Sequence, residues 1–220
     1  MDEEKQQDEN EGEGTGTEQA QEEQTQEQQP VLLYNALLFN KYDLSEVRVS
    51  DPGLVNYINL SPIYVPHTSG RHANLNFAKR HVNIVERLVN QMMRTENFTG
   101  KKTKALKVVM ETLEIIEKKT NRNPVQVLVE AIEHAAPREE ITRLQFGGIS
   151  VPRAVDVSSS RRLDLALRLI CQGAINASHG STKPIAQCLA DEITLASQGD
   201  MTSYAVSKRD ETERVAMSAR

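Results

Sequence analysis

The sequence predicts an all-α, mainly helical protein: a bundle of about six helices with one protruding β-hairpin between the third and fourth helices. Three observations predict this class. Apolar residues recur at the helical spacing of three and four residues from about residue 81 onward. The pattern changes to an alternation of apolar and polar residues around Gly147-Gly148. The helical spacing then returns from Leu163 toward the end of the chain.

Residues 1–30 are predicted to be a disordered acidic tail. They hold eleven acidic residues and one base, and only Met1 and Ala20 are apolar among them. Such a segment buries too little apolar surface to offset the entropy that ordering costs. Residues 31–220 are therefore expected to form a single helical domain, which begins with an apolar stretch from Val31 to Phe39.

Residues 40–80 are expected to be mostly irregular connection, because prolines and glycines interrupt them repeatedly. The helical period then appears in two successive segments. One apolar face includes Val85 and Val89, and the next includes Val109 and Leu113. These spacings predict the first two helices of the bundle.

The third helix has a clear beginning and end. The side chain of Asn123 is suited to cap the free amides of the first turn, and Pro124 fits the first helical position. Leu128 and Ile132 lie on its apolar face, and Pro137 ends the segment.

Residues 141–157 are predicted to form two strands of a hairpin. Gly147-Gly148 supplies the positive φ angles that a tight hairpin turn requires. Val151 and Val155 alternate on one face, which also carries Arg153. A two-stranded ribbon is marginally stable on its own in water. A ribbon that carries arginines on a helical body is therefore expected to project toward a partner.

Three further helices follow the hairpin. Helical spacing runs from Leu163 to Gly180 and again from about Pro184 to Gly199. A last, charged helix from about 205 to 218 is expected to bury little beyond Val206, Val215 and Ala216.

Membrane and secreted classes find no support in the sequence. No apolar run approaches the roughly 18 residues of a membrane span, and the chain opens with acidic residues instead of a signal peptide. Two cysteines, Cys171 and Cys188, are too few for a disulfide framework or a four-cysteine zinc site. We expect a soluble protein of the reducing cytoplasm, with no membrane contact.

Motifs for catalysis are also missing. The Gly100–Thr103 stretch lacks the phosphate-binding loop pattern, because Thr95 stands where the first glycine is needed. No two of the five histidines have the helical spacing of paired zinc ligands. Glu130, Glu133 and His134 are interpreted as polar residues on a solvated helix face. The sequence therefore predicts no enzyme, no cofactor and no metal.

The net charge of −5 averages two unlike parts of the chain. Residues 1–30 carry −10, so residues 31–220 carry +5, with 25 bases against 20 acids. The bases gather at loops, helix starts and the hairpin, where free amides and helix dipoles also favour anions. The candidate phosphate-binding residues are Arg71, Lys79, Arg80, Lys101, Lys102, Lys104, Arg143, Arg153, Arg161, Arg162, Lys208 and Arg209.

This charge pattern favours a non-catalytic protein that binds folded RNA by its phosphates and its shape. Aromatic residues make up 4% of the chain, so platforms for stacking single-stranded bases are scarce. The alternative is a DNA-architectural protein whose basic hairpin enters a groove. An enzyme would require a cleft around His134 or Cys171.

Five stretches of the chain resemble one known family. They are GRHANLNFAKR, VERLVNQMMR followed by GKKTKAL, NPVQVLVEAIEHAAPREE, AVDVSSSRRLDLALRLICQGA and IAQCLADEITLASQGDMTSYAVSKRDETERVAMSAR, which together span about 71–220. In combination they resemble the small-ribosomal-subunit protein seven family, in its archaeal and eukaryotic branch.

The resemblance implies a structural constituent of the small ribosomal subunit in the cytoplasm. It implies a primary binder of ribosomal RNA that helps to assemble the 3′ domain, which forms the head. It also implies a place near the messenger RNA exit path and the exit-site transfer RNA, beside small-subunit protein eleven and other head proteins. The positions that match RNA-facing elements of the family are Lys101-Lys102, Arg143, Arg153, Arg161-Arg162, Arg71, Lys79 and Arg80.

Overall fold

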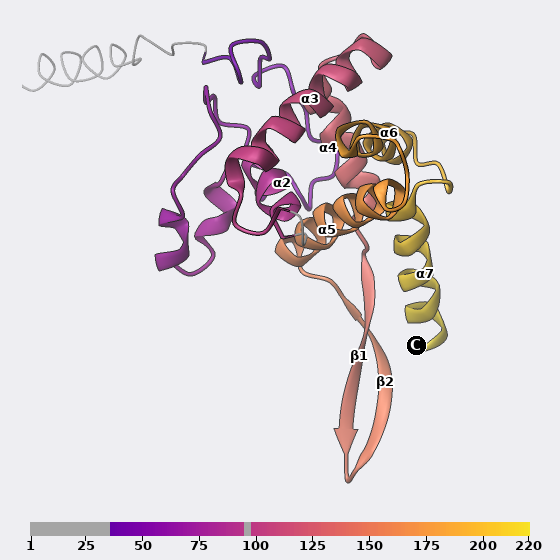
Figure 1. The fold of residues 1–220 in the computed structure, drawn as a ribbon. Coiled ribbons are helices and arrows are strands. Elements are labelled where there is room, and N and C mark those ends of the chain that lie inside the picture. Colours follow the sequence, from indigo (N-terminus) through magenta and orange to yellow (C-terminus); the bar gives the residue numbers. More distant parts are fainter. Residues whose placement is uncertain (1–35, 95–97) are drawn as a thin grey trace, which may run out of the picture. The chain divides into compact units, whose positions relative to one another are not determined.

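Six α-helices and one antiparallel hairpin form the regular structure of the described part of the chain, residues 36–94 and 98–220 (Figure 1). The structure is a computed structural model. The helices are α2 (Ile84–Met92), α3 (Lys102–Thr120), α4 (Pro124–Ala135), α5 (Ser159–Ser178), α6 (Ile185–Ser197) and α7 (Tyr204–Ser218). Strands β1 (Glu139–Phe146) and β2 (Ile149–Asp156) lie between α4 and α5, which confirms the predicted fold class. The tail predicted for residues 1–30 lies outside the described residues.

The segment before α2 is mostly irregular, as expected, and contains two short 3-10 turns, η2 (Arg71–Asn74) and η3 (Ala78–His81). It also contributes to the core, because Leu38, Leu44 and Leu54 are buried. Helical periodicity could not predict the burial of these side chains, because they lie outside regular helices and strands.

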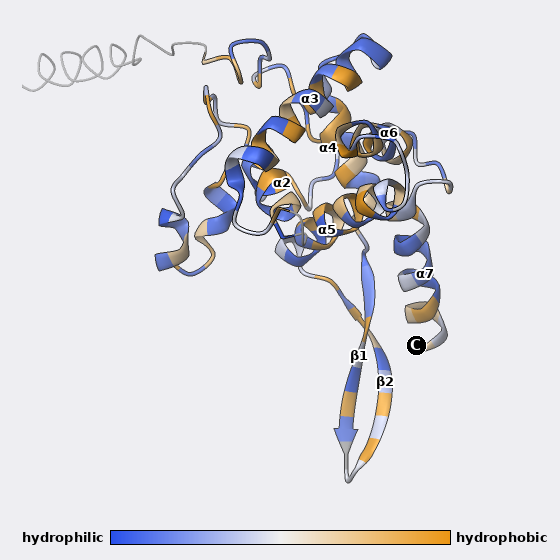
Figure 2. Cartoon of the chain, in the orientation of Figure 1, coloured by the Kyte–Doolittle hydropathy of each residue, from blue (hydrophilic) through white to orange (hydrophobic). Residues whose placement is uncertain are grey.

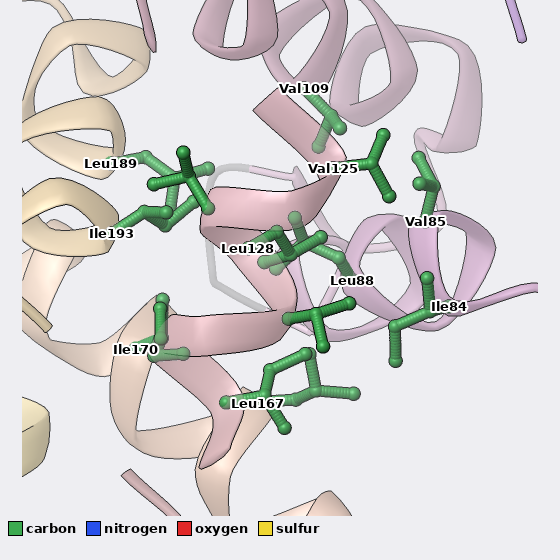
Figure 3. Close-up of a cluster of buried hydrophobic side chains, with 14 of the residues drawn as sticks. Ile84, Val85, Leu88, Val109, Val125, Leu128, Leu167, Ile170, Leu189 and Ile193 are labelled. Atoms are coloured by element: carbon green, nitrogen blue, oxygen red, sulfur yellow. The ribbon is translucent and has the colours of Figure 1, made fainter. Parts of the chain in front are cut away.

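Helix α4 runs through the middle of the core (Figure 3). Its apolar side chains, Leu128 among them, meet side chains of α2, α3, α5 and α6 in one cluster. The expected cap is present, since the side chain of Asn123 accepts a hydrogen bond from the amide of Val125 at 3.0 Å. The same side chain donates to the carbonyl of Asp43 at 2.7 Å, so the cap also fastens the early segment to α4.

The hairpin closes at Gly147 and Gly148, which both have positive φ, as a type I′ turn requires. Leu144 pairs with Val151 and Thr142 pairs with Arg153. Side chains that pair across the ribbon share a face. Figure 2 shows apolar and hydrophilic residues alternating along the ribbon, which extends away from the helices.

Helix α7 braces the base of the hairpin. The amide of Arg138 donates to Glu213 at 2.8 Å, and Arg220 forms an ion pair with Glu139 at the start of β1. Val206 is buried as predicted, but the prediction that Val215 is buried is wrong, because it is 48% exposed. Ala216, the third residue expected to be buried on this helix, does lie in the interior.

Candidate RNA interface

A cleft of about 650 Å³ lies between residues 67–81, which we call the basic lobe, and helices α2, α3 and α5. The cations that line it are Lys79, Arg87, Arg94, Lys102 and Arg168. Asp164 is the one carboxylate among the described residues that line it. A concave surface with this excess of positive charge concentrates the field on an anionic ligand.

Asp164 holds two of these cations in place. It accepts a hydrogen bond from Nη2 of Arg87 at 2.6 Å and another from Lys79. Burial favours a higher pKa for Asp164, but the hydrogen bonds from Lys79 and Arg87 outweigh it and lower the pKa below its usual value. The carboxylate therefore stays charged and ties the basic lobe and α2 to α5.

Glu86 on α2 is the second acidic anchor, and its side chain is fully buried. Its Oε1 accepts from the amide of Thr68 at 2.9 Å, from the hydroxyl of Thr68 at 3.0 Å and from Lys102 at 2.5 Å. Burial favours a higher pKa, but these three bonds lower the pKa of Glu86. The side chain of Lys102, which lines the cleft, is therefore held in place by an ion pair with the buried Glu86.

Four other predicted residues, Arg71, Arg80, Lys101 and Lys104, are exposed on the basic lobe and at the start of α3. Within the described ranges, none of the four has an ion pair to a carboxylate. Arg80 donates to the ring of His81 at 3.0 Å, and the ammonium of Lys104 lies 5.0 Å from the centre of the Phe98 ring. These cations remain available for phosphates.

The two hairpin arginines point to opposite faces of the ribbon. Arg153 pairs with Thr142, whereas Arg143 pairs with Pro152, and adjacent pairs alternate between faces. Both side chains are exposed. The ribbon therefore offers one guanidinium to a ligand on either side.

Arg161 and Arg162, neighbours in the first turn of α5, have different surroundings. Arg161 is 56% exposed and donates two hydrogen bonds to Glu140, of 2.7 and 2.6 Å. Arg162 is buried and donates to Asp51 at 2.8 Å and to the carbonyl of Pro137 at 3.2 Å. Arg161 lies at the surface beside the hairpin, while Arg162 joins three parts of the chain in the interior.

The two basic residues predicted on α7 are balanced by nearby acids. Lys208 pairs with Glu211, and Arg209 pairs with Asp210. Arg209 also donates to the carbonyl of His134, at the end of α4. The structure therefore places Lys208 and Arg209 away from the residues that line the cleft.

Sequence reasoning missed three of the five cations in the cleft: Arg87, Arg94 and Arg168. A signal was present, because residues seven apart lie on the same side of a helix. Arg87 and Arg94 have that spacing around α2, and Arg161 and Arg168 have it on α5. Runs of neighbouring bases in the chain do not show this spacing, because it follows the helical face instead.

Among the described residues, no cluster of three or more histidine, cysteine or acidic side chains is arranged to hold a metal ion. Burial raises the pKa of Cys171 to about 12, so this thiol stays protonated. None of the helices in the described ranges is long and apolar enough to span a membrane. A cationic cleft on a helical body, beside a projecting basic ribbon, suits a polyanionic ligand that is recognised by its charge and shape.

The chain belongs to the family described as ribosomal protein S7p/S5e, whose profile matches residues 54–220. It is 60% identical to small ribosomal subunit protein uS7 of Archaeoglobus fulgidus, over 84% of this chain and 95% of that protein. The uS7 proteins of Picrophilus torridus and Methanococcus aeolicus are 58% and 59% identical, over 84% and 83% of this chain and 98% of each relative. The resemblance to the small-subunit protein seven family is confirmed, and the DNA-architectural alternative gains no support.

Proposed function

We propose that this protein is a structural constituent of the small ribosomal subunit and binds ribosomal RNA through backbone phosphates. The cleft carries the proposal, because five cations line it. Asp164 and the buried Glu86 pair with three of them, and Arg94 and Arg168 have no ion pair to a carboxylate among the described residues. The family supports the same function, since relatives that align over most of the chain are named small ribosomal subunit protein uS7.

The mechanism is phosphate neutralisation by cations that the fold holds in position before RNA arrives. Asp164 fixes the exposed Lys79 at one wall of the cleft, so less side-chain entropy is lost on binding. The buried Arg87 holds Asp164 from the other side and has a positioning role. Arginine can also donate two parallel hydrogen bonds to one phosphate. In A-form RNA the phosphates and the shallow groove are the accessible features, so such a surface recognises shape more than sequence.

The more specific part of the proposal concerns the partners. We place the protein on the 3′ domain of the small-subunit RNA as a primary binder that helps the head to assemble in the cytoplasm. The projecting ribbon, with Arg143 and Arg153 on opposite faces, supports contact with messenger RNA and exit-site transfer RNA. Small-subunit protein eleven and other head proteins are the proposed neighbours, as the family resemblance implies. No step of this role requires catalysis or a cofactor.

The solvent exposure of each basic side chain decides which role we assign to it. Direct phosphate contacts are assigned to the exposed Arg71, Lys79, Arg80, Lys101, Lys104, Arg143, Arg153 and Arg161, with Lys102, Arg94 and Arg168 in the cleft. Arg162 is assigned a positioning role, since its side chain is buried. Lys208 and Arg209 are assigned weaker contributions, because acids neutralise them.

Binding of the full chain to a 3′-domain ribosomal RNA fragment tests the proposal. If about six phosphates are neutralised, the affinity should fall about a thousandfold between about 50 and 200 mM salt. Arg168→Ala should weaken binding and reduce the salt slope by about one. Lys183→Ala is the matched control, because this exposed lysine lies outside the cleft.

Two outcomes would contradict the proposal. One is an affinity that does not depend on salt. The other is a preference for duplex DNA over the RNA fragment in direct competition, which would favour the architectural alternative.

A further inference from the structure

The basic lobe displays two large apolar side chains to solvent. Phe77 is 78% exposed and Leu75 is 71% exposed, the two highest values among the exposed large hydrophobic residues that the structure describes. Single exposed apolar side chains are common on protein surfaces. Phe77 and Leu75 lie only two residues apart in the chain, and the rest of the described fold covers neither side chain.

The backbone holds Phe77 in an unfavourable conformation. Phe77 has a φ of 59°, in the left-handed region that bulky residues rarely adopt. Such conformations persist where the surrounding structure imposes them, and they gather at sites that contact ligands. The ring is therefore presented by a constrained turn instead of a freely varying one.

Hydrogen bonds fix the lobe on both sides of the ring. Before it, Thr68 donates its amide and its hydroxyl to the buried Glu86. After it, Lys79 pairs with Asp164, and the side chain of Asn59 donates to the carbonyl of His81. Figure 1 shows the lobe at the edge of the helical body, on the side away from α6 and α7.

The positive charge of the basic lobe around Phe77 indicates what kind of ligand would contact the ring. The lobe contains Arg71, Lys79 and Arg80 and no acidic residue. A ligand for this surface therefore combines negative charge with a flat apolar face. An unpaired nucleotide of RNA has both, because its base stacks on an aromatic ring while its phosphates pair with cations.

We infer that Phe77 stacks on an unpaired base of the bound RNA, next to the phosphates held by the cationic cleft. Leu75 covers the edge of the same base, and Arg71 and Arg80 neutralise the flanking phosphates. This inference rests on the proposed function and adds a contact that reads RNA structure: a base that is free to leave its helix. Double-stranded segments would satisfy the cations but not the ring.

Fluorescence gives a direct test, because the chain contains no tryptophan. Phe77→Trp creates a single reporter, and stacking on a base should quench its emission when the 3′-domain fragment is added. Met201→Trp is the matched control, since Met201 is 56% exposed and precedes α7. Quenching at position 77 without quenching at position 201 supports stacking. Equal emission with and without bound RNA at position 77 overturns it.

Affinity measurements test the same contact without a new fluorophore. Phe77→Asn removes the ring but tolerates the left-handed backbone, and should weaken binding about 5-fold to 150-fold with an unchanged salt slope. Phe77→Tyr should bind as the wild type does, whereas Phe77→Leu should lose affinity, because a leucine has no flat face. If Phe77→Asn binds the fragment as tightly as the wild type, the inference is wrong.

The two proposals fail in distinguishable ways. A wild-type protein that does not bind the fragment with a steep salt dependence contradicts the proposed function. A wild type that binds as proposed, with a Phe77→Asn variant that binds equally well, contradicts only the stacking contact. In that second case, loss of association with another head protein would assign the apolar pair to a protein neighbour.

Discussion

Replacing Arg162 by alanine would remove the interior partner of Asp51 and leave the carbonyl of Pro137 without its donor. The side chains of Arg162 and Asp51 are 10% and 19% exposed, so water reaches the separated groups poorly. Breaking a buried ion pair costs about 3 to 5 kcal/mol. Because Asp51 retains some contact with solvent, we expect about 3 kcal/mol, the lower end of that range.

The destabilisation should depend on pH with a defined sign. Burial favours a higher pKa for Asp51, but the hydrogen bonds from Arg162 and the amide of Gly53 outweigh it and lower the pKa. A carboxyl with a lowered pKa in the folded state stabilises the protein above its unfolded-state pKa, and that stabilisation is lost as the pH falls. The wild type and Arg162→Ala should therefore differ most near neutral pH, and less as the pH falls below about 4.

Urea unfolding followed by circular dichroism measures both effects. Arg161→Ala is the control, because this neighbouring arginine is 56% exposed, and a surface ion pair contributes about 1 kcal/mol or less. The Arg161→Ala variant should fold but bind RNA less tightly. Its unfolding free energy should fall by less than that of Arg162→Ala. Equal unfolding free energies for wild type and Arg162→Ala near neutral pH would refute the reasoning.

Three further expectations concern other parts of the fold. Glu86→Ala removes the acceptor of both Thr68 hydrogen bonds and the charge partner of Lys102. Hydrogen exchange around residues 67–70 should therefore speed up, and unchanged protection would contradict the anchoring role of Glu86. Asn123→Ala removes the cap of α4 and should lower stability by about 1 kcal/mol, measured by thermal unfolding. Because burial raises the pKa of Cys171 to about 12, its thiol should resist alkylation in the native protein and react once urea unfolds it.

The order of helices and hairpin was predictable because each element carries a local signal. Asn123-Pro124 marks a helix start. Gly147-Gly148 marks the hairpin turn, because glycine adopts the required positive φ angles without help from distant residues. Burial of Leu44 and Leu54 was not predictable, because their segment has no regular period and is ordered by the helices it packs on. The exposed position of Val215 was missed for a related reason: α7 is amphipathic only weakly, so its buried face is set by tertiary contacts.

The sequence predicts which residues of the candidate interface are basic, but it does not predict how the fold arranges them in space. Sequence alone indicates that Arg161 and Arg162 are basic and adjacent, whereas their different surroundings depend on Asp51 and Glu140, which are distant in sequence. Likewise, the cleft brings together residues from the basic lobe, α2, α3 and α5. The seven-residue spacing of Arg161 and Arg168 on one helix could have been recognised in the sequence. The ion pair between Lys79 and Asp164 could not, because these residues are distant in the chain.

The ribbon has consequences for the protein before it meets RNA. Both of its strands are edge strands, which in principle can recruit strands of other chains and start aggregation. Proline and charged side chains oppose such recruitment, and Pro152 stands opposite Arg143 in the pairing. The same residues that deter foreign strands therefore keep the outer part of the ribbon unpaired, so that it stays accessible for the proposed contact with RNA.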